Sequence, residues 1–278
     1  MKQEIYLCVK YAGKLCDMLE ASKIRFERSS AEDQAFGFDW ITFTVDAASP
    51  EWPSIEGCLD TCDVLSEIRK NVYSEDELEC AEWLHIAAMC LKVEDGGGVR
   101  NFDICENKIG GICYARTRHP NIVTTKPIKW TKRHAIYGGY EFGYDEIFCN
   151  EDFAACLQAQ QLPVHFVPVY HARTQQTIPN LLYLQPDIVL PLEAVDLRGV
   201  QLQSDCPVCG RRTYMLQECE QISIYRRFLD NVHGICATPR IWGPGGASPT
   251  ILISQNVFGL LKAKRLLRGV RLTPVIIK

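Results

Sequence analysis

Two cysteines of this chain have the spacing of metal ligands. Cys206 and Cys209 lie in the run Cys-Pro-Val-Cys-Gly, where a two-residue gap lets both sulfurs turn toward one point. Gly210 lets the backbone fold beneath them, but no second C-x-x-C follows at the usual distance. The downstream residues that could complete a four-ligand zinc site are Cys219, His233 and Cys236. Zinc binding is one hypothesis for this segment, and a tight turn between two strands is the other.

The number of cysteines and the N-terminal sequence together indicate the cellular compartment. The chain has 14 cysteines among 278 residues, and its first twenty residues carry charge throughout, unlike a signal peptide. We therefore expect a cytoplasmic protein, in which unpaired thiols pack as small hydrophobes. Several cysteines have apolar neighbours and are expected in the core: Cys8, Cys80, Cys90 and Cys156. No apolar run approaches the roughly 20 residues of a membrane span, so no membrane partner is expected.

Charge is distributed unevenly although the net charge is only -4. Residues 51–106 carry 14 acidic and 4 basic side chains, residues 107–140 carry 7 basic and no acidic ones, and residues 251–278 carry 6 basic and no acidic ones. One interpretation is that these blocks pair with each other across the fold. The other is an acidic surface that attracts a cationic partner. Its expected members are Glu75, Asp76, Glu77, Glu79 and Glu82.

Hydrophobic periodicity predicts the elements that position these residues. Alternating residues predict strands near 3–10 and 39–45, with a short helix over 11–21 between them. A second helix is predicted over about 57–70. Ser74 and Glu77 form a capping box, which predicts a third helix that continues to Leu91.

A repeat gives the strongest indication of the architecture. Residues 147–169 and 252–275 each contain a short apolar strand, an Asn or Ser suited to cap a helix, a helix of about three turns and an alternating strand. Both copies end in Pro-Val. Phe153 aligns with Phe258, and one further residue is inserted in the second copy. The agreement in order and length indicates an internal duplication.

The duplication predicts an α+β fold of two related halves, each with strands flanked by a helix, and an elaborated N-terminal region. Prolines interrupt regular structure near residues 170–195. We therefore expect an N-terminal half of residues 1–170 that ends in the first repeat unit. The C-terminal half, residues 171–278, would hold the C-x-x-C-G segment and the second repeat unit.

The second repeat and the segment before it resemble a bacterial family. The C-x-x-C-G run, the aromatic-glycine stretch Trp242–Gly246 and the ending from Ile253 to Val275 are similar to the double-CXXCG group and the related DUF1629 or Imm11-like immunity proteins. The resemblance covers about residues 200–278, and a weaker similarity extends over residues 140–170. A second C-x-x-C-G is missing from the first half. The resemblance implies a non-catalytic immunity protein that binds and silences a cognate toxin of a polymorphic toxin system.

Two alternatives come from other classes of protein. A basic run with an aromatic residue suits nucleic-acid binding, namely Lys126, Lys129, Trp130, Lys132, Arg133 and His134. The acidic block opposes a polyanion, so a zinc-knuckle nucleic-acid-binding protein is the second choice. An enzyme is less favoured, because the sequence contains no G-x-S-x-G, H-E-x-x-H or phosphate-loop motif.

Overall fold

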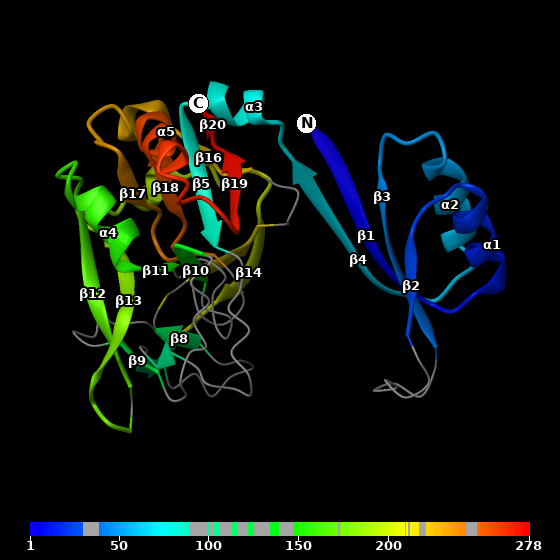
Figure 1. Cartoon of the computed structure of the whole chain (residues 1–278), viewed down its shortest axis with the longest axis horizontal. Coiled ribbons are helices and arrows are strands. Elements are labelled where there is room, and N and C mark those ends of the chain that lie inside the picture. The colour runs from blue at the N-terminus through cyan, green and yellow to red at the C-terminus, as the bar shows by residue number, and fades with distance from the viewer. Residues whose placement is uncertain are drawn as a thin grey trace. The chain divides into compact units, whose positions relative to one another are not determined.

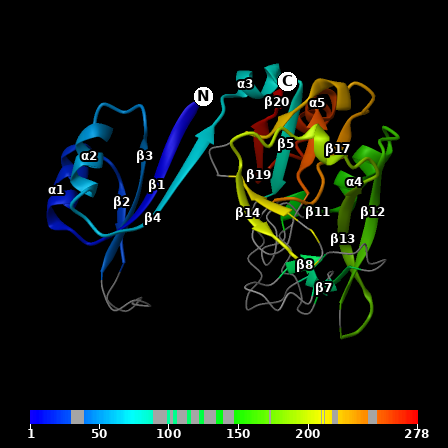
Figure 2. The ribbon, with the colours of Figure 1, turned by 180° about the vertical axis from the view of Figure 1, so that it is seen from behind.

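The computed structural model describes most of the chain in two compact units (Figure 1; seen from behind in Figure 2). The first unit is Met1–Glu77, and the second consists of Leu78–Leu216 and Gln221–Lys278. The described residues are 1–29, 39–88, 99–100, 103–105, 113–115, 122–124, 134–138, 147–171, 173–208, 210, 212–216, 221–242 and 249–278. The protein has an α+β fold, as predicted.

The first unit is an antiparallel sheet covered on one face by two helices. The sheet order is β2-β3-β1-β4, and the elements are β1 (Lys2–Lys10), α1 (Gly13–Ala21), β2 (Phe26–Arg28), β3 (Trp40–Asp46), α2 (Trp52–Leu59) and β4 (Val64–Val72). Alternate residues of β1 and β3 are buried, as in a sheet with one face on the core. Leu15 and Leu19 of α1 and Ile55 of α2 pack against that face.

The second unit contains the remaining elements. Its helices are α3 (Glu75–Cys80, which crosses from the first unit), α4 (Glu151–Gln158), α5 (Gln255–Ala263) and the 3₁₀ helices η2 (Leu192–Ala194) and η3 (Arg226–Phe228). Its strands are β5 (Trp83–Ala88), β6 (Val99–Arg100), β7 (Asp103–Cys105), β8 (Cys113–Ala115), β9 (Ile122–Thr124), β10 (Ile136–Gly138), β11 (Ile147–Cys149), β12 (Val164–His171), β13 (Thr177–Pro186), β14 (Gln201–Asp205), β15 (Arg212–Met215), β16 (Ser223–Ile224), β17 (Ile235–Ala237), β18 (Ile251–Ser254), β19 (Val270–Pro274) and β20 (Ile276–Ile277).

The two repeats form the same arrangement of strands. The first lies in a sheet of order β10-β11-β13-β12-β9-β6, and the second forms a sheet of order β17-β18-β5-β19. In each, the strands before and after the helix are antiparallel to a strand that lies between them. That middle strand is β13 in the first repeat and follows it directly along the chain. In the second repeat it is β5, which comes from far earlier in the sequence.

The registers of the two repeats also agree residue for residue. Ile136 lies opposite Cys149 in the first repeat, and Ile235 lies opposite Ile253 in the second. A backbone hydrogen bond at the residue before each helix is repeated as well, since Asn150 N–H donates to Ala135 O at 3.0 Å and Ser254 N–H donates to Gly234 O at 2.8 Å.

The structure corrects the alignment within the helix by one residue. Phe153, Ala154 and Leu157 form the buried face of α4, and Val257, Phe258 and Leu261 form that of α5. Phe153 therefore corresponds to Val257, because the helix-capping residues Asn150 and Ser254 set the start of each helix. The extra residues of the second repeat lie after the helix.

The repeats share a single apolar core. It contains the buried faces of both helices together with residues of both sheets, including Ile147 of β11 and Ile86 of β5. Two further contacts join side chains of the first repeat to glycines of the second. Leu162, which follows α4, occupies the space where a side chain of Gly234 would lie, and His134, which precedes β10, does the same at Gly269 after α5. Both glycines have positive φ.

The predicted boundary between residues 1–170 and 171–278 does not match the division of the structure. The units separate between Glu77 and Leu78, and β12 and β13 form an antiparallel pair on either side of residue 171. Strand β5 also joins the C-terminal repeat.

Two helix predictions are wrong. The segment predicted as a helix over 57–70 contains the end of α2, which has a proline in its first turn, and most of strand β4. The capping box starts a helix correctly, with reciprocal bonds between Ser74 and Glu77, but α3 ends at Cys80. Most of β5 is buried between two neighbouring strands, and periodicity alone cannot distinguish such a run from a buried helix.

If the repeats are equivalent in packing, equivalent truncations destabilise them equally. Leu157→Ala and Leu261→Ala each remove a fully buried side chain from the same position of the shared core. We expect each to lower the free energy of unfolding by about 2–5 kcal/mol. Urea denaturation followed by circular dichroism measures this. The exposed neighbour Gln158→Ala serves as the control, and a negligible effect of either leucine variant would contradict a shared core.

Candidate functional site

A cleft of about 500 Å³ lies on the second unit, where the second repeat begins. Its lining comes from the start of α5, the approach to β17, the segment after η3, the start of β5 and the loop after α4. The main contributors are Glu82, Trp83, Leu162, Arg226, Asp230, His233, Gly234, Ser254, Asn256, Val257 and Leu260. The cleft therefore joins apolar walls to a polar rim.

Gly234 lines this cleft and leaves no room for a side chain. A Cβ atom there would lie 2.4 Å from Cδ2 of Leu162 and 3.1 Å from Cγ2 of Val257, and the φ angle is +78°. The corresponding residue of the first repeat is Ala135. Glycine at this point lets the loop after α4 pack directly onto the backbone that leads to β17.

The rim carries both signs of charge, with carboxylates in the majority. Arg226 donates two hydrogen bonds of 2.8 Å to the two carboxylate oxygens of Glu82. This contact lowers the pKa of Glu82, and the Glu82 carboxylate, followed by the charge of Asp230, raises the pKa of Arg226. Asp230 and His233 are exposed beside this pair. Such a rim suits a ligand segment that is basic and partly apolar.

The predicted acidic surface is partly neutralised within the chain. Besides Glu82, Glu79 pairs with Lys262 of α5, which joins the acidic block to the C-terminal basic block. Glu77 accepts from Ser74 N–H at 2.8 Å and lies 2.5 Å from the N-terminal amine. Glu75 and Asp76 are exposed in the first turn of α3. Some of these carboxylates therefore pair with basic residues of the chain, and others are exposed to solvent. Binding of a partner by the five residues stays a prediction.

The cysteine segment connects the antiparallel strands β14 and β15. Gly210 has φ +67°, and its N–H donates to Cys206 O at 2.8 Å, so the chain turns there as the glycine predicted. Cys206 is buried, with 3% of its surface exposed. Cys209 and Cys219 lie outside the described residues.

The two further candidate ligands that the structure describes, His233 and Cys236, lie in different surroundings. His233 is exposed at the cleft, whereas Cys236 lies on β17 in an apolar cluster that contains Trp83 and Trp242. Burial raises the pKa of the Cys236 thiol to about 12, which opposes the thiolate that zinc requires. Within the described part of the chain, no three His, Cys, Asp or Glu side chains are placed to hold a metal ion. Cys209 and Cys219 lie outside that part, so zinc binding through Cys206 and Cys209, with Cys236 among the further candidate ligands, stays a hypothesis.

Metal analysis of the purified protein tests this hypothesis. If Cys206 and Cys209 bind zinc, one zinc ion per chain should copurify and Cys206→Ser should abolish it. Cys80→Ser, at an exposed cysteine of α3, is the matched control and should keep the metal. Zinc-free wild-type protein, purified without chelator, would leave only the turn interpretation.

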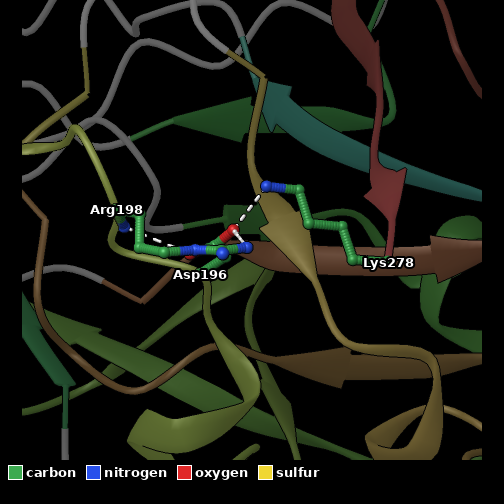
Figure 3. Close-up of polar contacts among 3 residues, drawn as sticks. All are labelled: Asp196, Arg198 and Lys278. Atoms are coloured by element: carbon green, nitrogen blue, oxygen red, sulfur yellow. Dashed lines mark hydrogen bonds and ion pairs between the residues drawn. The ribbon is translucent and has the colours of Figure 1, made fainter.

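A charge cluster around one buried carboxylate was not foreseen from the sequence. Asp196 has 2% of its side chain exposed and binds Arg198 through two hydrogen bonds of 2.8 Å (Figure 3). Lys278, 82 residues away in the sequence, contacts the same carboxylate. These contacts hold the pKa of Asp196 well below its usual range. The cluster ties the end of the chain to the loop after η2, beside the parallel pair β16 and β20.

Asp196→Asn should make the stability of the protein less dependent on acid pH. Because the folded-state pKa is lowered, the carboxylate stabilises the fold above its unfolded pKa of about 3.9 and loses this effect as pH falls through the folded pKa. The urea midpoint of the variant should therefore be lower than that of wild type at pH 7, and the difference should shrink below about pH 4. Asp205→Asn, which removes a more exposed pair with Arg212, is the control. A difference that is independent of pH would contradict the assignment.

Other sequence predictions fall outside the described residues. These are the basic run from Lys126 to Arg133 and the glycine stretch at 243–246; His134 of that run contacts Arg268 O through its ring. In the part of the chain that the structure describes, no helix is long and apolar enough to cross a membrane. Comparison of the chain with family models, curated proteins and solved structures found no match.

Proposed function

We propose that this protein is a non-catalytic immunity protein that binds and neutralises a cognate toxin of a bacterial polymorphic toxin system. The observation that carries the proposal is the position of the cleft. Ser254, Val257 and Leu260 belong to the segment that resembles immunity proteins, and all three line the cleft. The resemblance and the cleft thus coincide at the start of α5.

The chemistry of the rim indicates the kind of toxin. Glu82 and Asp230 flank a single arginine, and the apolar wall behind them can receive aliphatic or aromatic side chains. A cationic toxin, such as a nuclease, presents basic segments of this kind. Acidic groups at a binding surface speed association with such a partner. Salt screens this attraction, so the rate should fall as the salt concentration rises. The protein would act in the cytoplasm, where the toxin would otherwise reach its target.

Co-expression with a candidate toxin tests the proposal directly. The candidate is the variable C-terminal domain of a large protein encoded next to this gene. Wild-type protein should restore growth to cells that produce the toxin domain, and the two proteins should copurify. Failure of both assays with the adjacent toxin would refute the proposal, and salt-dependent binding of single-stranded RNA instead would favour the nucleic-acid alternative.

A charge reversal on the rim tests where the toxin binds. Asp230→Lys should slow association with a cationic toxin by about tenfold at low salt, and the loss should diminish at high salt. Stopped-flow association rates measure this. Glu20→Lys makes the same change of net charge on α1 of the first unit and should leave the rate nearly unchanged. The pair Glu75→Lys and Asp76→Lys distinguishes the start of α3 from the cleft: equal slowing by that pair would assign binding to α3.

A further inference from the structure

The outer strand of the first unit presents an unusual edge. Strand β4 is nine residues long, about 30 Å, and among the described strands it pairs only with β1. An open strand edge offers a row of N–H and C=O groups to another chain. Natural proteins commonly block such edges with charges, and β4 carries Glu67, Arg69 and Lys70.

The backbone of β4 has a defined set of outward groups. Ala47 N–H donates to Gln3 O and Tyr11 N–H donates to Asp39 O, so odd-numbered residues of β1 bond to β3 and even-numbered residues bond to β4. The β4 partners of those even-numbered residues include Ser66, Ile68 and Lys70. Glu67 and Arg69 therefore direct their backbone N–H and C=O groups away from β1, to the side on which no described strand pairs with β4.

The side chains along this edge are complementary to themselves. If a second β4 pairs antiparallel with Ile68 opposite Ile68, then Glu67 of each copy lies opposite Arg69 of the other. The outward backbone groups fit the same register. Ile68 then forms a non-hydrogen-bonded pair, in which side chains approach closely, and the two Glu67–Arg69 pairs are hydrogen-bonded pairs.

We propose that β4 is a docking edge for a second copy of this chain, centred on Ile68. The two sheets then continue into one another, and α1 and α2 of both copies cover the same face. This inference goes beyond toxin binding and uses no residue of the cleft.

The charges on this edge are already held in place. Arg69 donates from Nε to Oε1 of Glu67 at 2.6 Å, and its guanidinium lies 5.9 Å from the ring centre of Trp52. Arg69 also lies 4.0 Å from Glu56 of α2. In the paired edge each guanidinium faces the Glu67 carboxylate of the second copy as well as its own. The charges that repel an unrelated strand thus favour an identical one. The ends of β4 are apolar and about two-fifths exposed at Val64, Leu65 and Val72, so pairing covers them.

Charge variants of the full chain test the proposal without altering the fold of the sheet. Wild-type protein should sediment as a dimer at micromolar concentrations. Glu67→Arg places a cation opposite Arg69 of the second copy, and Arg69→Glu places two carboxylates opposite each other. Each variant alone should dimerise at least about tenfold more weakly, since like charges directly opposite destabilise a strand pair.

Mixing the two variants provides the decisive measurement. The Glu67→Arg chain and the Arg69→Glu chain are complementary to each other, so the mixture should form a heterodimer that native mass spectrometry resolves. Glu27→Arg on β2, the opposite edge strand, is the matched control and should dimerise like wild type. Circular dichroism confirms that each variant is folded. A monomeric wild type, or a dimer that both variants leave unchanged, would overturn the proposal, whereas neither result bears on binding at the cleft.

Discussion

The second unit depends on one apolar core that serves two repeats at once. Neither helix has enough buried surface to stabilise a repeat alone, because α4 and α5 each direct only three buried residues inward. The core forms when both sheets and both helices meet. The contacts at Gly234 and Gly269 fix how they meet, since in each case a side chain of the first repeat fills the space beside a glycine of the second. The cleft lies beside this packing, since Gly234 and Leu162 both line it.

Local patterns in the sequence were sufficient to predict the repeats. Each is a strand, a capped helix and a strand within about 25 residues, so the information that specifies it lies close together. The first unit was predicted in part for the same reason. Alternation identified β1 and β3, but β4 has charged residues on the face that α2 covers, and this obscured its strand character.

Long-range pairings could not be predicted in this way. Strand β5 follows a correct capping signal, and only its neighbours β18 and β19 decide that the chain is extended there. Lys278 contacts Asp196 because a parallel strand pair brings distant segments together. The spacing of nearby residues in the sequence cannot predict such a contact. Glu82 and His233 were expected to have separate roles, yet the fold brings both to one cleft. Sequence patterns also did not predict which cysteines are buried. Cys80 was expected in the core and is exposed, whereas Cys236, a candidate ligand, is buried in the core.

The position of β5 in the sequence also has a consequence for the order in which the parts of the second unit can fold during synthesis. The first repeat obtains its middle strand from the residues that follow it, so its three central strands have all been synthesised once Pro186 leaves the ribosome. The second repeat needs a strand that was synthesised before the first repeat began and must wait for Pro274. During that interval β5, an apolar strand with two open edges, has no permanent neighbours. Non-local pairing of this kind slows folding. The assembly of the second unit is therefore governed by its last strands.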